Sequence, residues 1–405
     1  MNRINLNLIT LFTPTPENVK GPSALIYYLI KYRPCHININ IYTYNWNDIP
    51  KTQLHQISKN LQCNITQIPP SLFLRLIYKL KLTKIRLFLK YPLLSYVCLS
   101  NNIKKILDTE PSDLIWIYPD SLFRIIKKNP SYKYIITGPD CSSLPYFRML
   151  DDPYIYQKPL LTLGYAKLLV NNIRLDKENC NKNCLYHVVG MEDWKRIRQI
   201  SPTKNAFFLL HPHYELIQDP IINFQKEKLK LLIAGNNDFY MSTGINELIP
   251  VLCSMNDLLK ETYEITFLGK GWESICEKLS ENKIQCNIKK WVKNYIEEIS
   301  QYDIQLTPIT IGAGTKGKVL DAIGNGVLTI GTRIALENIA VRHMESCIMY
   351  NNAEEIPIIL TAIQNNKQKY QSIAKKGMQQ VRQYHSPKRL SKRFFEITNK
   401  FFNIW

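Results

Sequence analysis

The 405-residue sequence has little glycine, comparatively few acidic residues and no long apolar run. It contains only 15 glycines, and 33 Asp and Glu residues stand against 52 Lys and Arg. No stretch approaches the ~20 uninterrupted apolar residues of a membrane span. The N-terminal MNRINLNLITLF has too many asparagines and too short an apolar core for a signal peptide. We therefore expect a soluble or peripheral protein.

The cysteine pattern excludes a disulfide scaffold. Ten cysteines are scattered along the chain without dense, regular spacing. The one close pair, Cys180 and Cys184, lacks the second pair or the nearby histidines that would complete a zinc site. We predict ordinary buried thiols, a reducing cytoplasm and no metal site.

The length of the chain indicates its architecture, and its net charge indicates its partner. A chain of this length and 45% hydrophobic content is long enough for two cores, because single cores stop growing at about 250–300 residues. The formal net charge of +19 indicates an anionic partner, which is nucleic acid, a lipid surface or a phosphate-bearing substrate.

Strand-like and helix-like segments alternate twice along the chain, which predicts an α/β protein with parallel sheets. The expected strands are INLNLITLF, ININIYTYN, SDLIWIYPD and YKYIITGPD in the first half, and LKLLIAGN, YEITFLGKG, IQCNIKKWV, YDIQLTPI and GVLTIGT in the second. ELIPVLCSMNDLLKE reads as one helix, and the chain beyond about 355 reads as helical. The pattern loses its periodicity near 206–228. We predict two Rossmann-like domains, 1–205 and 206–384, with the helix 385–405 returning to the first and the ligand between them.

Five of the glycines fall within Gly312–Gly326, in the stretch GAGTKGKVLDAIGNG. This stretch follows an expected strand and opens an expected helix, so backbone N–H groups and the positive end of the helix dipole point at the ligand edge. Gly312 and Gly314 permit close backbone approach to a phosphate, and Lys316 adds a positive charge. The alternative is a packing turn between helix and sheet. A Walker A loop is excluded, since the Gly-Lys-Ser/Thr ending is absent.

Asp321 comes five residues after Lys316, about one and a half helical turns further along. A carboxylate there can accept hydrogen bonds from the two hydroxyls of a ribose while the loop holds phosphates. Phosphate and ribose together predict a nucleotide diphosphate.

At this point the sequence resembles the retaining glycosyltransferases of family 4, which have the GT-B fold of two Rossmann-like domains facing each other across a donor cleft. TPITIGAGTKGKVLDAIGNG reproduces the family pattern P-x-x-x-G-A-G-x-K-x-K-V-L-E-A-x-x-x-G. LLIAGNNDFYMSTGINELIPVL, EITFLGKG and KKWVKNYIEEISQYDIQLTPI extend the resemblance over most of 206–345. It is weaker over 1–205.

The resemblance implies a set of donor-binding residues. Lys316 would contact the donor phosphate, Asp321 the ribose, and Gly21 the phosphates and sugar from the N-terminal domain. The full expected donor set is Gly21, Gly235, Asn236, Gly312, Gly314, Thr315, Lys316, Lys318 and Asp321. Three departures stand out: Ala313 replaces the first of two family carboxylates, the loop NNDFYMSTG lacks a basic residue, and Asp321 replaces a Glu.

The implied reaction moves a sugar from a UDP- or GDP-linked donor to a glycan or lipid-linked acceptor with retention, in bacterial surface polysaccharide or lipopolysaccharide assembly. No Asp-x-Asp triplet for a divalent metal is present, so we expect no cofactor and assign neutralisation of the leaving diphosphate to amides and Lys316. Asp140, just past an expected strand, is the candidate that orients the acceptor. Its alternative is a helix N-cap or an Asx-turn. His211 and His213 near the domain join read as structural.

Ser71–Lys90 is basic, apolar and free of acidic residues, like a helix lying on an anionic membrane. The expected membrane-surface residues are Arg75, Lys79, Lys84, Arg86 and Lys90. The alternative is an ordinary solvated helix face. Such contact would place the enzyme on the inner face of the plasma membrane. Two other functions stay open: a catalytically silent scaffold of the same fold, and a DNA-modifying glucosyltransferase. Nucleic acid is not the expected partner, because the basic residues lie among aliphatic ones.

Overall fold

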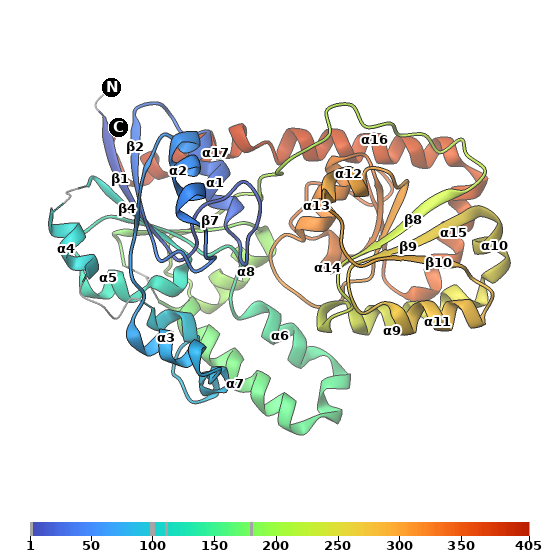
Figure 1. Cartoon of the computed structure of the whole chain (residues 1–405), viewed down its shortest axis with the longest axis horizontal. Helices are drawn as coiled ribbons and strands as arrows, with labels where there is room; N and C mark the ends of the chain where they lie inside the picture. The colour runs from blue at the N-terminus through green and yellow to red at the C-terminus, as the bar shows by residue number, and fades with distance from the viewer. Residues whose placement is uncertain (1–2, 98–101, 110–111, 179–180, 405) are drawn as a thin grey trace. The chain divides into compact units, whose positions relative to one another are not determined.

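The computed structural model of the protein describes residues 3–97, 102–109, 112–178 and 181–404 (Figure 1). The chain divides into two compact units, with residues 1–212 and 387–405 in unit 1 and residues 213–386 in unit 2. The first division lies between Pro212 and His213, a few residues from the 205/206 division expected from the sequence.

Unit 1 contains one parallel sheet of seven strands in the order β3-β2-β1-β4-β5-β6-β7. Its strands are β1 (Ile4–Thr10), β2 (Ile37–Thr43), β3 (Asn64–Gln67), β4 (Leu114–Tyr118), β5 (Tyr134–Thr137), β6 (Cys184–Val188) and β7 (Ala206–Phe208). Its α-helices are α1 (Ala24–Lys31), α2 (Lys51–Leu61), α3 (Leu72–Lys79), α4 (Asn102–Thr109), α5 (Arg124–Lys128), α6 (Leu144–Asp151), α7 (Pro159–Asp176), α8 (Met191–Ile200) and α17 (Pro387–Phe402). Its 3₁₀ turns are η1 (Thr83–Leu87), η2 (Leu93–Tyr96), η3 (Asp120–Leu122) and η4 (Pro153–Gln157).

The core of unit 1 centres on β4, whose five residues are all buried. Leu8 of β1 pairs in register with both Ile41 of β2 and Trp116 of β4. The C-terminal helix α17 belongs to this core, because its Phe394 ring lies 4.7 Å from the Trp116 ring. The Ser391 hydroxyl donates a hydrogen bond to the Leu29 carbonyl of α1, 2.7 Å away.

Unit 2 contains one parallel sheet of six strands in the order β10-β9-β8-β11-β12-β13. Its strands are β8 (Leu229–Ala234), β9 (Tyr263–Leu268), β10 (Cys286–Lys289), β11 (Ile304–Thr307), β12 (Leu328–Thr332) and β13 (Ile348–Tyr350). Its helices are α9 (Phe239–Ser254), α10 (Asn256–Thr262), α11 (Glu273–Glu281), α12 (Tyr295–Ile299), α13 (Gly317–Gly324), α14 (Arg333–Leu336), η5 (Ala353–Glu355), α15 (Ile356–Asn365) and α16 (Lys367–Tyr384).

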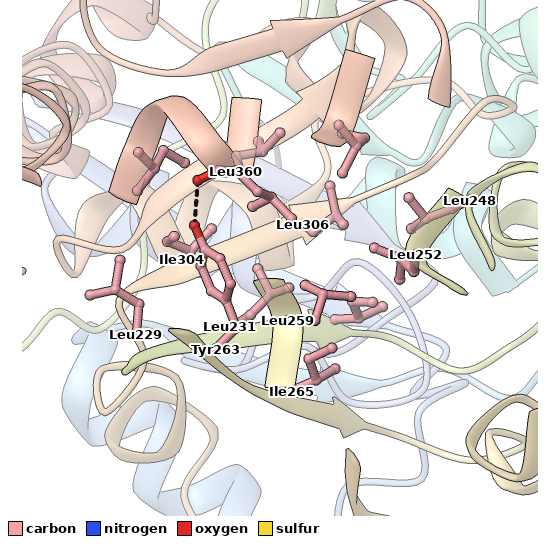
Figure 2. Close-up of a cluster of buried hydrophobic side chains, with 14 of the residues drawn as sticks. Leu229, Leu231, Leu248, Leu252, Leu259, Tyr263, Ile265, Ile304, Leu306 and Leu360 are labelled. Carbon is pink, nitrogen blue, oxygen red and sulfur yellow. Dashed lines mark hydrogen bonds between the residues drawn. The ribbon is translucent and has the colours of Figure 1, made fainter. Parts of the chain in front are cut away.

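The side chains of β8 alternate between the two faces of the unit 2 sheet, and apolar residues point to both faces. Helices therefore cover both faces. Leu229, Leu231 and Ile233 face α9, α10 and α15 in the larger cluster, part of which Figure 2 shows. Leu232 and Ala234 face the opposite way, into a cluster with residues of α12 and α13. The Tyr263 hydroxyl satisfies its polarity by donating to the Leu360 carbonyl, 2.8 Å away (Figure 2). The expected α/β class with two parallel sheets is confirmed.

Two sequence predictions about helices are wrong. The expected single helix over 247–261 is two helices, α9 and α10, with Met255 between them. The basic stretch 71–90 is the eight-residue helix α3 followed by the 3₁₀ turn η1. Lys81 adopts the left-handed conformation (φ 56°), and the Leu82 N–H bonds to the Ile77 carbonyl at 2.9 Å. This is a Schellman ending, which stops α3 before the stretch is half complete.

Among the described residues, none of the helices combines the length and the apolarity that crossing a membrane requires.

Candidate functional site

The strand order of unit 2 places a topological switch point between β8 and β11, the strands from which the chain leaves in opposite directions along the sheet. In open parallel sheets, ligands bind outside the carboxyl ends of the strands at this point. The loop after β8 is Gly235–Asp238, and the loop after β11 is Pro308–Lys316. The predicted donor residues of unit 2 therefore come from the two loops that flank the switch point and from the helix α13 that follows.

The glycine-rich loop after β11 folds around the side chain of Lys316. Gly314 has a φ of 64°, a left-handed conformation that favours glycine, and a Cβ on Gly312 would lie 3.3 Å from the Lys316 Cε. The Lys316 ammonium donates to the carbonyl of Gly314 at 3.1 Å and lies 2.7 Å from the Glu337 carboxylate. Lys316 is also the N-cap residue of α13. The lysine is thus held at the helix start, where α13 carries its positive dipole end.

Three buried polar groups in these loops have no hydrogen-bond partner among the described residues. They are the hydroxyls of Thr310 and Thr315 and the side-chain carbonyl of Asn237. Buried polar groups in native proteins are almost always paired, so each unpaired group needs an explanation. Three such groups in the loops beside one switch point indicate a site for a polar ligand.

Asp321 lies half-buried on α13, and no hydrogen bond to its carboxylate is present among the described residues. Burial raises the pKa of Asp321 to about 7, although the charge of Lys318 opposes this shift. The Tyr295 hydroxyl of α12 is buried beside it without a hydrogen-bond partner in the described structure. A carboxylate and a hydroxyl without hydrogen-bond partners can both bond to the hydroxyl groups of a bound sugar.

Lys318 links α13 to the loop after β8. Its ammonium lies 5.6 Å from the centre of the Tyr295 ring. Burial lowers the pKa of Lys318, and the carboxylates of Asp238 and Asp321 both oppose that shift, which shows that these groups act on one another. Lys316, Lys318 and Asp321 thus lie along the first turns of α13, and Asp238 of the β8 loop acts on the pKa of Lys318.

The loop after β8 holds its predicted residues at the sheet edge. The Gly235 carbonyl accepts a hydrogen bond from the Trp272 indole at 2.8 Å, and the exposed Asn236 side chain accepts one from the Lys270 N–H at 3.0 Å. Asp238 caps α9 by accepting from the Tyr240 N–H at 3.0 Å. The β8 loop, which lacks a basic residue, thus carries the carboxylate of Asp238. The exposed Lys270, whose backbone N–H bonds to this loop, is a nearby cation.

Gly21 lies in unit 1, in the long loop between β1 and α1. A Cβ at this position would lie 2.5 Å from the Phe12 ring, so only glycine fits. The loop is held by Ser23, whose N–H donates to the Gly21 carbonyl at 2.8 Å, and by the Thr15–Ser23 hydroxyl pair at 2.6 Å. The loop follows β1, which with β4 flanks the switch point of the unit 1 sheet.

Asp140 lies half-buried just past β5, at the carboxyl end of the unit 1 sheet. It is not the N-cap of α6, which is Ser143. The amide groups next to it are held by other carboxylates. The Cys141 N–H donates to Asp193 at 2.8 Å, and the Ser143 N–H donates to Asp176 at 2.9 Å. Cys141 and Ser143, which follow Asp140, are thus held by carboxylates of α8 and α7.

A buried polar network that the sequence did not reveal lies at the same edge of the unit 1 sheet. The Tyr186 hydroxyl donates to the Asp120 carboxylate at 2.7 Å. The fully buried Lys204 donates to the Asp176 carbonyl, and its ammonium lies 4.1 Å from the Tyr186 ring centre. Burial, reinforced by the charge of Asp176, raises the pKa of Asp120 to about 6.

The two histidines near the domain join contact neighbouring backbone. Burial lowers the pKa of His211 to about 4, and it also lowers the pKa of His213. Their Nδ1 atoms lie 2.9 Å from the Pro212 carbonyl and 3.0 Å from the Tyr214 carbonyl. Both rings are thus tied to neighbouring backbone.

The five predicted membrane-surface residues are all exposed, although they do not share one helix. Arg75 and Lys79 lie on α3, Lys84 and Arg86 on η1, and Lys90 follows η1.

No group of three or more His, Cys, Asp or Glu side chains in the described residues is arranged to hold a metal ion. Cys184 is buried in β6, while Cys180 lies outside the described residues.

Sequence reasoning missed Glu337, Thr310, Asn237 and Tyr295. Glu337 lies 21 residues beyond Lys316, after α14, and no motif connects the two. The signal that could have found it is topological, because the carboxyl ends of β11 and β12 meet at one edge of the sheet.

Comparison with known proteins points to the region that contains the glycine-rich loop. Residues 251–396, which include the glycine-rich loop, match a protein family described as glycosyl transferase-like. A search of curated proteins found no match to this chain.

Solved structures resemble the whole chain. HepE of Anabaena in complex with UDP has a TM-score of 0.64 at 10% identity, over 98% of this chain and 100% of that chain. Sucrose-phosphate synthase from Thermosynechococcus elongatus has a TM-score of 0.66 at 12% identity, over 100% of both chains. WaaG, a glycosyltransferase involved in lipopolysaccharide biosynthesis, has a TM-score of 0.56 at 14% identity, over 96% of this chain and 99% of that one. The predicted GT-B fold is confirmed.

Proposed function

We propose that the protein is a glycosyltransferase that moves a sugar from a nucleotide-diphosphate sugar, UDP- or GDP-linked, to a glycan or lipid-linked acceptor. The observation that carries this proposal is the loop after β11, which holds Lys316 and the unpaired hydroxyls of Thr310 and Thr315. Asp321, whose carboxylate accepts no hydrogen bond among the described residues, follows Lys316 by about one and a half turns on α13. Phosphate oxygens would pair with the loop, and ribose hydroxyls with Asp321. The family match over 251–396 supports the same chemistry.

We further infer that transfer proceeds with retention and without a divalent metal, as in family 4. The bond between the sugar C1 and the donor phosphate oxygen breaks, and a bond from C1 to the acceptor oxygen forms on the same face. The acceptor proton passes to the departing phosphate oxygen. Backbone amides at the start of α13 and Lys316 stabilise the charge that develops on the leaving diphosphate, a contribution of about 3 kcal/mol per donor in comparable sites. Asp140 orients the acceptor from unit 1.

The proposed setting is bacterial surface polysaccharide or lipopolysaccharide assembly on the cytoplasmic face of the plasma membrane. The net charge of +19 and the exposed basic residues of α3 and η1 support an anionic membrane as the partner. WaaG, which shares the fold, is involved in lipopolysaccharide biosynthesis.

Nucleotide titration without metal tests the donor site. The purified protein is titrated with UDP, GDP, CMP and inorganic phosphate. Binding is measured by the shift in thermal unfolding and by the heat released in calorimetry. At 100 times the Kd, the right nucleotide should add about 2.7 kcal/mol of stability. Asp321→Asn should weaken the response, whereas Asp257→Asn, an exposed carboxylate on α10, should not. A response to none of the ligands, or an equal response to free phosphate, would contradict the assignment.

Two observations favour a second candidate, a catalytically silent protein of the same fold. Glu337 already neutralises Lys316, and Ala313 replaces a carboxylate of the family pattern. Such a protein would bind nucleotide without consuming it. Hydrolysis or transfer of the sugar from a bound nucleotide sugar over hours distinguishes the two candidates.

A further inference from the structure

Unit 1 carries a helical hairpin with apolar side chains exposed to solvent. The hairpin runs from α6 through η4 to α7, and Figure 1 shows it extending from the sheet of unit 1. Leu160 and Leu163 of α7 are 87% and 68% exposed, and Tyr156 of η4 is 63% exposed. A contiguous group of large exposed apolar residues usually marks an interaction surface, whereas isolated ones need no explanation.

The helix α3 and the turn η1 expose apolar side chains beside this hairpin. Leu72 is 75% exposed and Phe88 is 87% exposed, while α3 buries Leu74 and Ile77 on its other side. A hydrogen bond from the Asn171 side chain of α7 to the Arg86 carbonyl of η1, 3.4 Å long, ties the two regions together.

Arg86 lies where the elements converge. Burial raises the pKa of Tyr78 on α3, of Tyr146 on α6 and of Tyr165 on α7, and in all three cases the Arg86 guanidinium opposes the shift. The rings of Tyr146 and Tyr165 lie 6.3 Å apart. We call the exposed surface of α3, η1, η4 and α7 the hairpin face.

The charge of the hairpin face is mostly positive, and its acidic residues are Asp151 and Asp152 at the end of α6. The sequence contains no Asp or Glu from residue 49 to 107 or from 153 to 175. Its exposed cations are Arg75, Lys79, Lys81, Lys84, Arg86, Lys90, Lys158 and Arg174. A second copy of the chain meeting this face with its own would place like charges opposite each other, which is unfavourable. Nucleic acid would pair with the cations but would leave the exposed leucines in water.

An anionic bilayer satisfies both features, because its acyl boundary takes leucine side chains and its headgroups pair with lysine and arginine. We propose that the α6–η4–α7 hairpin inserts its apolar side chains, led by Leu160 and Leu163, into the interfacial region of an anionic membrane, with the basic residues of α3 and η1 against the headgroups. This inference deepens the membrane placement in the proposed function, but it does not depend on sugar transfer.

Vesicle binding without nucleotide tests the proposal. The protein is sedimented with vesicles of phosphatidylcholine alone and of phosphatidylcholine with 30% phosphatidylglycerol. We expect binding to the anionic vesicles, weaker binding to the neutral ones, and at least a tenfold loss of affinity in Leu160→Ser/Leu163→Ser. The matched control is Ile358→Ser, an exposed apolar residue of unit 2 that is 72% exposed. It should bind like the parent.

A second readout separates insertion from surface attraction. Tryptophan fluorescence of Leu163→Trp should be quenched by brominated acyl chains beyond the parent level, and that of Ile358→Trp should not. If charge reversal at Arg75 and Lys79 abolishes binding while the leucine variant binds fully, the membrane contact stands and insertion is wrong. No binding to anionic vesicles, or self-association that the leucine variant removes, would overturn the proposal.

Discussion

The Lys316 ammonium and the Glu337 carboxylate lie 2.7 Å apart, with their side chains only 10% and 5% exposed. The glycine-rich loop wraps the lysine, and two of its carbonyls also accept from it. Because the pair is neutral as a whole, the positive charge that the sequence assigned to this loop is balanced in the unliganded protein. An arriving diphosphate must share the lysine with Glu337 or separate the two.

Replacing Lys316 by alanine should abolish transfer and also destabilise unit 2. Removing one partner of a buried pair leaves an uncompensated charge, at a cost of about 3–5 kcal/mol. Thermal unfolding and turnover are measured together. The double change Lys316→Met/Glu337→Gln should recover much of the stability but not the activity. Recovered turnover in the double variant would show that Lys316 does not act on the donor.

Replacing Glu337 by glutamine should tighten nucleotide diphosphate binding. Gln keeps the size and a hydrogen-bond acceptor for Lys316 but removes the negative charge that competes with the phosphates. We expect Kd to fall by up to about tenfold, which corresponds to about 1.4 kcal/mol. The change should shrink as salt rises, since the interaction is electrostatic. Glu345→Gln, at an exposed ion pair of unit 2, is the control. Weaker binding in Glu337→Gln would mean that this carboxylate serves the donor directly.

The order of strands and helices was predictable because each strand is a short run of apolar residues that ends in turn-forming residues. LKLLIAGN alternates between two covered faces, and its glycine ends the strand. The break at Lys81 was not predictable from periodicity, because the leucines continue with helical spacing through it. Only the left-handed conformation of Lys81 and its hydrogen bonds end α3 there.

The candidate site was predictable where it is local in sequence and not where it depends on tertiary contacts. Glycine spacing and the position of Lys316 and Asp321 sufficed to place a loop at a helix start. Glu337 required knowledge that β11 and β12 are neighbours. The network around Asp120 required three strands to be assembled, because isolated Asp, Tyr and Lys residues carry no motif.

Asp120→Asn should change how the stability of unit 1 depends on pH. Burial raises the pKa of this carboxyl above its ordinary value, to about 6 in the folded protein. The folded state therefore holds the proton more tightly, and this contribution is fully present below about pH 4 and lost as pH rises through about 6. A carboxyl pKa raised to about 6 corresponds to about 3 kcal/mol of this contribution.

The asparagine keeps an acceptor for Tyr186 without the ionisation, so the variant should gain stability relative to the parent as pH rises from 4 to 7. Chemical denaturation across that range, followed through unit 1, checks this. A difference between parent and variant that stays constant with pH would contradict the raised pKa.

Asp321 should make nucleotide-sugar binding depend on pH near neutrality. Its pKa of about 7 in the unliganded protein means that the carboxylate is mostly protonated at pH 6 and mostly ionised at pH 8. The ionised form is the better acceptor for two ribose hydroxyls. Apparent affinity scales with the fraction of the competent form, so it should rise by up to about tenfold between these pH values.

A nucleotide sugar is the right probe, because its diphosphate is a diester that stays ionised throughout this range. Calorimetric titrations at pH 6, 7 and 8 should show the rise for the parent and for the Asp257→Asn control. Asp321→Asn should bind more weakly at pH 8 and lose the pH dependence. An affinity that falls as pH rises would indicate repulsion between Asp321 and the phosphates, and the carboxylate could then not hold the ribose.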